Sequence, residues 1–193
     1  MPVGDCERAF AQAAALDGIV LLRAREPWLN QRGHLGLPAQ VGDVQHVLED
    51  IFLALGGDLA AQEAKRATTP LPGDFVHPDT GTLIEIDESQ HFTSFRLLTL
   101  DRYPPHASLG FDREYYRTLC ETWRPVSDKY RRTKAAVGFG PGGRQRQRAY
   151  YDALRDLATP AMGRRPVIRI DAADRDGASA YQRVRDHLHD ELR

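Results

Sequence analysis

The stretch Gly73–Phe92, GDFVHPDTGTLIEIDESQHF, decides the fold of this chain. Two predicted strands, Asp74–His77 and Thr82–Asp87, flank the turn residues Pro78–Gly81, and together they form a hairpin. Residues alternate between the two faces of a strand. Leu83, Glu85 and Asp87 therefore share one face, with Ile84 and Ile86 on the other.

Acidic side chains stand within this predicted hairpin. Asp74, Glu85 and Asp87 lie on its strands, and His91 follows its end. A carboxylate inside a strand is costly to bury unless it holds a cation. Converging carboxylates with no lysine among them favour a divalent metal with a preference for oxygen ligands, such as Mg²⁺. The alternative is a solvated strand face whose acids pair with arginines.

The 193 residues and 41% hydrophobic content allow one domain with a real core. No apolar run is long enough to span a membrane, and the N-terminus lacks a secretory signal. Cys6 and Cys120 are too few for a disulfide framework. We therefore expect a cytoplasmic protein that does not contact membranes.

The net charge of −1 conceals a segregation along the chain. Residues 1–101 hold 7 Lys and Arg against 15 Asp and Glu, whereas residues 102–169 hold 15 against 6. An acidic half beside a basic stretch is typical of a metal site next to a phosphate-binding surface. Ordinary surface charges that pair internally would give the same count.

The remaining pattern predicts a mixed sheet with helices on both faces. Apolar spacing and end signals give helices and strands outside the hairpin. The expected helices are 5–16, 43–55, 93–101, 112–134 with a break or a kink at Pro125, 144–158 and 178–192, and the expected strands are 18–23, 59–68 and 167–170. We expect an N-terminal helix and arm over residues 1–42, then a domain over 43–193 with a helical insert at about 103–143.

This order of motifs resembles the PD-(D/E)xK, or restriction-endonuclease-like, superfamily. An aspartate stands in Gly73–Val76, a glutamate in Leu83–His91, and a basic helix and another strand follow. The similarity covers roughly residues 43–171 and is nearest to the very-short-patch-repair-endonuclease-like branch. It implies an αβββαβ core. Asp87 replaces the usual lysine, and Glu88 replaces a glycine common in that branch.

The resemblance also implies the roles of the acidic residues. Asp74 and Glu85 would bind Mg²⁺ or Mn²⁺, and Glu49 occupies the position of a glutamate that relatives place in the first core helix. Asp87 or His91 would orient the attacking water, because a histidine titrates near neutral pH. Each has a simpler interpretation: Glu49 as a solvated residue, Asp87 as a turn former, and His91 as a residue next to a helix cap.

Arginines are the expected nucleic-acid contacts, since a guanidinium binds two phosphate oxygens at once. The candidates are Arg96, Arg144, Arg148 and Arg155. Arg96 could instead pair with Asp101, and Arg148 with Asp152 one helical turn away.

We therefore predict a metal-dependent endonuclease that hydrolyses phosphodiester bonds, with DNA favoured as the substrate. It would act with a partner protein or as a homodimer, because no separate DNA-reading domain is evident. The missing lysine motivates the alternative, a catalytically inactive protein of the same fold that binds nucleic acid as an assembly subunit. A third interpretation is an unrelated α/β protein in which the acidic cluster has no function. A structure that keeps Asp74 away from Glu85 would establish it.

Overall fold

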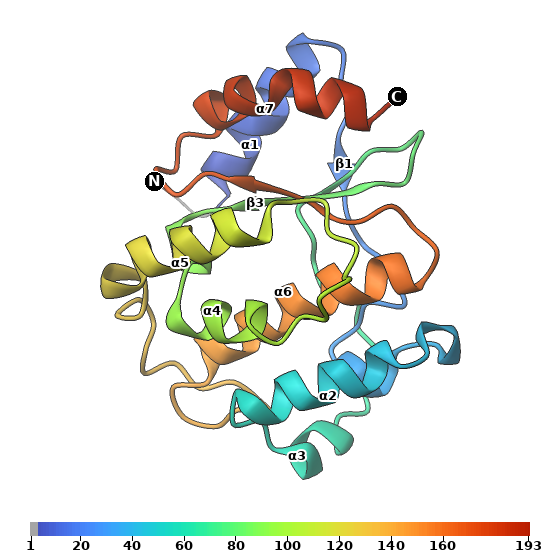
Figure 1. Ribbon diagram of the computed structural model, residues 1–193, viewed down its shortest axis with the longest axis vertical. Coiled ribbons are helices and arrows are strands. Elements are labelled where there is room, and N and C mark those ends of the chain that lie inside the picture. Colours follow the sequence, from blue (N-terminus) through green and yellow to red (C-terminus); the bar gives the residue numbers. More distant parts are fainter. Residues whose placement is uncertain (1–3) are drawn as a thin grey trace.

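The computed structural model describes residues 4–193, which form a mixed sheet covered by helices on both faces (Figure 1). The strands are β1 (Leu22–Arg23), β2 (Phe75–Val76), β3 (Leu83–Asp87) and β4 (Ile168–Asp171). The α-helices are α1 (Asp5–Leu16), α2 (Val44–Ala54), α3 (Leu59–Glu63), α4 (Ser94–Leu100), α5 (Arg113–Ser127), α6 (Arg144–Ala161) and α7 (Gly177–Glu191). Short 3₁₀ helices occur at Gly33–Gly36, Ala39–Val41 and Ser89–His91.

The four strands lie in the order β1-β2-β3-β4. β1 and β2 are antiparallel, as are β2 and β3, whereas β3 and β4 are parallel. A parallel pair needs a long crossover connection, and α4, α5 and α6 supply it between β3 and β4. The expected mixed sheet flanked by helices is confirmed.

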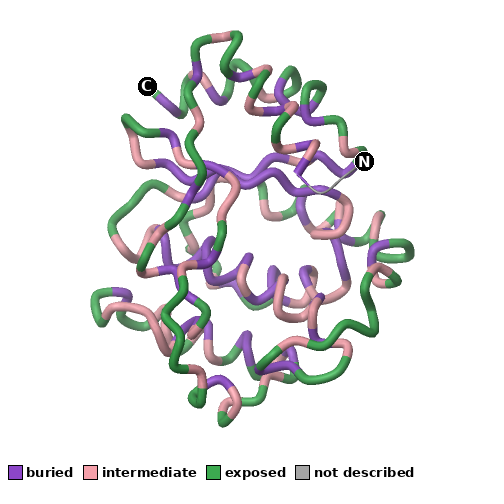
Figure 2. The backbone as a smooth tube through the Cα atoms, turned by 180° about the vertical axis from the view of Figure 1, so that it is seen from behind, coloured by how far each residue is buried: buried purple, intermediate pink, exposed green. Residues whose placement is uncertain are grey.

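The alternation within β3 separates two hydrophobic cores. Ile84 and Ile86 belong to the core beneath α1 and α7, whereas Leu83 belongs to the larger core around α6. In Figure 1, α1 and α7 lie on one side of the sheet and α4, α5 and α6 on the other, with α2 beyond α6. Figure 2 shows that the buried backbone follows the central strands and α6. Glu85 and Asp87 therefore face the α6 side.

A close helix crossing fixes α1 against α7. A side chain at Gly177, the first residue of α7, would place its Cβ 1.9 Å from the carbonyl oxygen of Cys6. Any larger residue would force the two helices apart, so glycine is required at this crossing. The segment before residue 43 thus contributes α1 to the layered unit and β1 to the edge of the sheet.

Capping residues set several helix starts that the sequence predicts. The Thr93 side chain accepts a hydrogen bond from Arg96 N at the start of α4, and Asp112 accepts from Glu114 N and Tyr115 N at the start of α5. Such caps satisfy backbone N–H groups that lack a partner within the helix.

Two predictions of local structure were wrong. Residues 59–68 do not form a strand, because the Asp58 side chain accepts from Ala61 N and starts the alanine-rich helix α3. Pro125 does not break α5, which continues to Ser127. Within residues 4–193, no helix is both long and apolar enough to cross a bilayer.

Candidate active site

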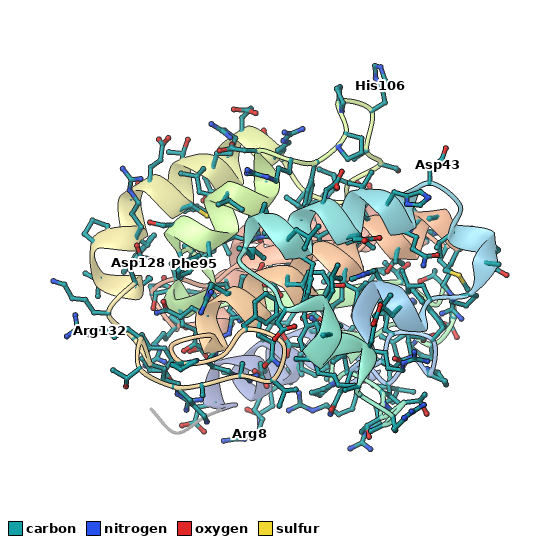
Figure 3. All side chains as sticks on the ribbon, turned by 90° about the horizontal axis from the view of Figure 1, so that it is seen from below. Arg8, Asp43, Phe95, His106, Asp128 and Arg132 are labelled. Atoms are coloured by element: carbon teal, nitrogen blue, oxygen red, sulfur yellow. The ribbon has the colours of Figure 1, made fainter. Side chains whose placement is uncertain are left out.

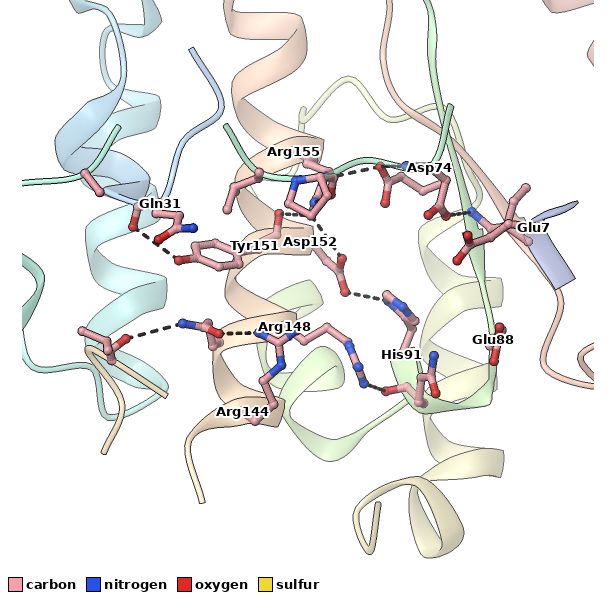
Figure 4. Close-up of a pocket in the computed structure, with 18 of the residues that line it drawn as sticks. Glu7, Gln31, Asp74, Glu88, His91, Arg144, Arg148, Tyr151, Asp152 and Arg155 are labelled. Carbon is pink, nitrogen blue, oxygen red and sulfur yellow. Dashed lines mark hydrogen bonds and ion pairs between the residues drawn. The ribbon is translucent and has the colours of Figure 1, made fainter. Parts of the chain in front are cut away.

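A cavity of about 540 Å³ opens between the β2–β3 hairpin and α6 (Figure 4). Its volume falls within the range of small-ligand sites, about 300–1,000 Å³. The charged lining residues come from the hairpin, from α1, from the segment after α3 and from α6. They are Glu7, Lys65, Arg66, Asp74, Glu85, Glu88, His91, Arg144, Arg148, Asp152 and Arg155.

Asp74 and Glu85 meet on neighbouring strands at the wall of this cavity. The Asp74 carboxylate accepts a hydrogen bond from Ile86 N at 2.8 Å, and Asp74 N donates to Glu85 Oε1 at 3.3 Å. Only 5% of Glu85 is exposed, whereas Asp74 is partly exposed. The structure therefore brings together the two acids that the hairpin spacing predicts. Separation of the two acids, which would have established the third interpretation, is not observed.

Both carboxyl groups titrate abnormally. Burial raises the pKa of Asp74 well above its ordinary value, and the nearby charges of Glu85 and Glu7 raise it further. Burial also raises the pKa of Glu85, although Arg155 and Arg169 oppose that shift. The site therefore disfavours two negative charges in close proximity. A bound cation would relieve the repulsion between them.

The donor set suits a magnesium ion that shares its ligands with a substrate. Across residues 4–193, no three His, Cys, Asp or Glu side chains form a ready-made metal cluster. Mg²⁺ is, however, usually held by one or two carboxylates, with waters and substrate phosphates completing the octahedron. The oxygens of Asp74 and Glu85 fit that requirement.

Helix α1 contributes one acid to the cavity, Glu7, which the sequence analysis overlooked. Glu7 lies on α1, lines the cavity and accepts from Arg23 Nη1 at 3.2 Å. Glu49, the predicted third ligand, lies on α2 and does not line this cavity. It lies near His34, whose pKa is lowered by burial, and the charge of Glu49 partly opposes that shift. The sequence could have indicated Glu7 as a site residue, because its helix directly precedes the first strand.

His91 lines the cavity and is held by two carboxylates from behind. Its Nδ1 lies 3.0 Å from Asp152 Oδ2 and 3.2 Å from Asp87 Oδ1. Burial raises the pKa of Asp152, but His91 and Arg169 outweigh that effect and hold it below its ordinary value. Anchoring Nδ1 in this way leaves Nε2 as the ring atom available to a ligand.

Asp87 is placed behind the cavity rather than on its wall. It is 1% exposed, and Arg169 Nη1 donates to its two oxygens at 2.9 and 3.0 Å. Asp87 is therefore not in a position to contact a water or a metal in the cavity. The residue acts on the site through His91. Pairing of the strand acids with arginines is the predicted alternative to a metal site. Asp87 makes such a pair, but in the protein interior rather than on a solvated face.

A buried ionic network lies between β4 and α6. Arg169 Nε donates to Asp156 Oδ1 at 2.6 Å, and Arg169 Nη2 lies 3.5 Å from Asp152 Oδ1. Arg96 Nη2 donates to Asp156 Oδ2 at 2.7 Å, and only 1% of Arg96 is exposed. The prediction that Arg96 contacts nucleic acid was therefore wrong, and so was its proposed pairing with Asp101. The guanidinium is enclosed by the protein and neutralises Asp156.

The other three predicted arginines do gather at the cavity, where α6 presents them on one face. Arg148 Nη1 donates to Gln90 O at 3.1 Å, and Arg144 Nη1 donates to Gln147 Oε1 at 2.6 Å. Neither is paired with a carboxylate among the described ion pairs, so both retain charge for an anion. Arg155 differs, because it is 8% exposed and its Nε lies 3.4 Å from Glu85 Oε1.

The cavity is thus polarised between an acidic wall and a basic wall. Asp74, Glu85 and Glu7 stand opposite Arg144 and Arg148, and Figure 4 shows these arginines on α6 facing His91 and the hairpin. An anionic group that enters the cavity would meet guanidinium groups on one side. On the other side it would need a cation to approach the carboxylates.

Comparison with known proteins adds one match. Residues 50–136, under half of the chain, match the model of DUF7255, a family of unknown function. That segment contains Asp74, Glu85 and His91 but ends before α6. The searches found no curated protein and no solved structure similar to the chain.

Proposed function

We propose that this protein is a metal-dependent nuclease that hydrolyses phosphodiester bonds, with DNA as the favoured substrate. The observation that carries the proposal is the Asp74–Glu85 pair, two desolvated carboxylates on adjacent strands that face free arginines across one cavity. The order α1, β1, β2, β3, α6, β4 supports a restriction-endonuclease-like core, with α2 and α3 inserted between β1 and β2, and α4 and α5 before α6.

Asp74 and Glu85 would hold Mg²⁺ or Mn²⁺. When bound, the metal supplies positive charge to the scissile phosphate and lowers the pKa of water. Arg144 and Arg148 bind the non-bridging phosphate oxygens and orient the substrate. With Nδ1 anchored by Asp152, His91 takes or gives a proton at Nε2. No step requires Asp87 to contact substrate.

Arg155 is a cation beside the acidic pair, in a chain that carries Asp87 at the usual lysine position. Its Nε lies 3.4 Å from Glu85 Oε1, and its Nη2 donates to Pro72 O at 2.6 Å. The guanidinium therefore stands beside the acidic pair, fixed in position by the backbone. From there it can stabilise negative charge that develops at the phosphate, as a lysine near the same carboxylates would.

Cleavage of plasmid and single-stranded DNA, measured with Mg²⁺, Mn²⁺ or EDTA, tests the proposal. We expect metal-dependent cutting by the wild type and a loss of at least about 10²-fold in Asp74→Asn and Glu85→Gln, because each removes a charged metal ligand. Glu121→Gln, an exposed carboxylate on α5, is the matched control and should cut like the wild type. Equal cutting by all four proteins would overturn the assignment.

One observation favours a second function. The pairing of Arg155 with Glu85 already places a positive charge beside the carboxylates. A catalytically inactive nuclease-fold protein that binds nucleic acid as a subunit would show this arrangement. Such a protein would not cleave DNA with any metal ion. Removing metal with EDTA would leave its affinity for nucleic acid unchanged.

A further inference from the structure

An exposed basic loop follows α5 and precedes α6. Residues 129–134 read KYRRTK, and the cationic residues Lys129, Arg131, Arg132 and Lys134 are all exposed. Figure 3 shows the Arg132 side chain extending away from the body of the molecule. Four positive charges are thus presented to solvent within six positions.

The loop cations have no acidic partners in the described part of the chain, since none of them takes part in an ion pair there. Exposed arginines elsewhere differ: on α7, Arg183 pairs with Asp174 and Arg185 pairs with Asp17. Asp128, the acid next to the loop, accepts hydrogen bonds from Ser94 N and Oγ at 2.9 and 2.6 Å. The loop therefore carries uncompensated charge, which mutual repulsion makes unfavourable without an anion nearby.

The structure anchors this loop next to the basic wall of the cavity. Arg144 N donates to Lys134 O at 3.0 Å, and the Gln145 side chain donates to the carbonyls of Ser127 and Tyr130. These bonds hold the loop on the first turn of α6. Burial lowers the pKa of Arg148, and the charge of Arg131 contributes to that shift. Arg131 of the loop is therefore close enough to interact with Arg148 of the cavity.

We propose that loop 129–134 binds the phosphodiester backbone of a nucleic acid outside the cavity, as a continuation of the Arg144–Arg148 wall. This inference takes its substrate class from the proposed function. Four exposed cations without acidic partners, grouped on a turn beside the basic wall, match the closely spaced phosphates of a nucleic-acid strand. The loop has no exposed large apolar side chain with which to enter a lipid surface, because its aromatic residue, Tyr130, is half-buried beneath Arg131.

Equilibrium binding in EDTA separates this inference from catalysis. Fluorescence anisotropy with labelled single-stranded DNA and RNA oligonucleotides would give Kd over a range of KCl concentrations. In a variant with all four loop cations changed to glutamine, we expect the slope of log K against log salt to fall by about 3, since each single-strand phosphate contact contributes about 0.7. Equal effects on the two oligonucleotides would identify the shared backbone as the ligand.

The matched control changes the same number of charges far from the loop. Arg164, Arg165, Arg183 and Arg185 lie at the other end of α6 or on α7, and the control variant replaces these with glutamine. It should retain the wild-type slope, and circular dichroism melts would confirm that both variants fold. An unchanged slope in the loop variant would overturn the inference, as would loop-dependent binding to phosphatidylserine vesicles with none to oligonucleotides. Loss of binding in the loop variant, with no cleavage by the wild type, would retain the inference and refute the nuclease proposal.

Discussion

Replacing Arg169 by glutamine tests the ionic network that supports the site. The guanidinium is fully buried and is paired with three acids: Asp87 at 2.9 Å, Asp156 at 2.6 Å and Asp152 at 3.5 Å. Glutamine can keep one hydrogen bond but brings no charge. The variant therefore asks how much the enclosed carboxylates depend on this single cation.

The partners that remain after the change decide the cost. Asp156 keeps its ion pair with Arg96 at 2.7 Å, and Asp152 keeps its contact with His91 at 3.0 Å. Asp87 keeps only the His91 contact at 3.2 Å, while its side chain is 2% exposed. The variant thus leaves about one buried carboxylate without adequate compensation. Breaking a buried pair in this way costs about 3–5 kcal/mol.

Thermal and urea unfolding measure that loss directly. A chain of this size loses about 2–4 °C in Tm for each kcal/mol, so we expect Tm to fall by about 6–20 °C. In the double variant Asp87→Asn/Arg169→Gln, the unpaired charge is gone and stability should recover by at least about 1 kcal/mol. Asp87→Asn alone should destabilise. A loss below about 1 kcal/mol in Arg169→Gln, or no recovery in the double variant, would refute the reasoning.

Three further perturbations address the cavity itself. Burial and Glu85 raise the pKa of Asp74, so the metal-free protein should lose stability as the pH rises through that raised pKa. Asp74→Asn should weaken this pH dependence, leaving the part due to Glu85, and raise Tm by about 2–4 °C at pH 7 in EDTA. Melts between pH 4 and 8 with an unchanged profile would contradict this expectation. Asp152→Asn should lower kcat by about 10²-fold, because His91 loses the carboxylate that orients it, while Kd for an oligonucleotide stays near the wild-type value. A wild-type kcat would exclude a positioning role for Asp152. Arg148→Gln should raise Kd for single-stranded DNA about tenfold and reduce the slope of log K against log salt by about 0.7. Anisotropy titrations that show neither change would mean that Arg148 does not bind the DNA.

Features that depend on short-range pattern could be predicted. The alternation of β3 placed Ile84 and Ile86 on one face and Glu85 on the other, because successive side chains of a strand always point to opposite sides. The helices around residues 5–16, 44–54 and 144–161 follow from the spacing of their apolar residues. The hairpin placed Asp74 beside Glu85, since a short turn fixes which residues face each other.

Packing between distant segments was beyond such patterns. Arg96 looked like a surface cation, but α4 packs against α6 and buries it against Asp156, 60 positions away. Residues 59–68 were ambiguous because their alanines suit a helix as well as a weak strand, and Asp58 decided between them.

The sequence by itself determined that a mixed α/β unit would hold two carboxylates on adjacent strands with arginines nearby, because these features rest on local periodicity and turn geometry. Tertiary structure alone decided which charges face the cavity and which are enclosed. The parallel pairing of β4 with β3 joined Arg169 to Asp87, and the packing of α1 brought Glu7 rather than Glu49 to the cavity. The physical reason is that a buried charge must find its partner wherever the chain folds back. The spacing of residues along the sequence does not show which distant residue will be that partner.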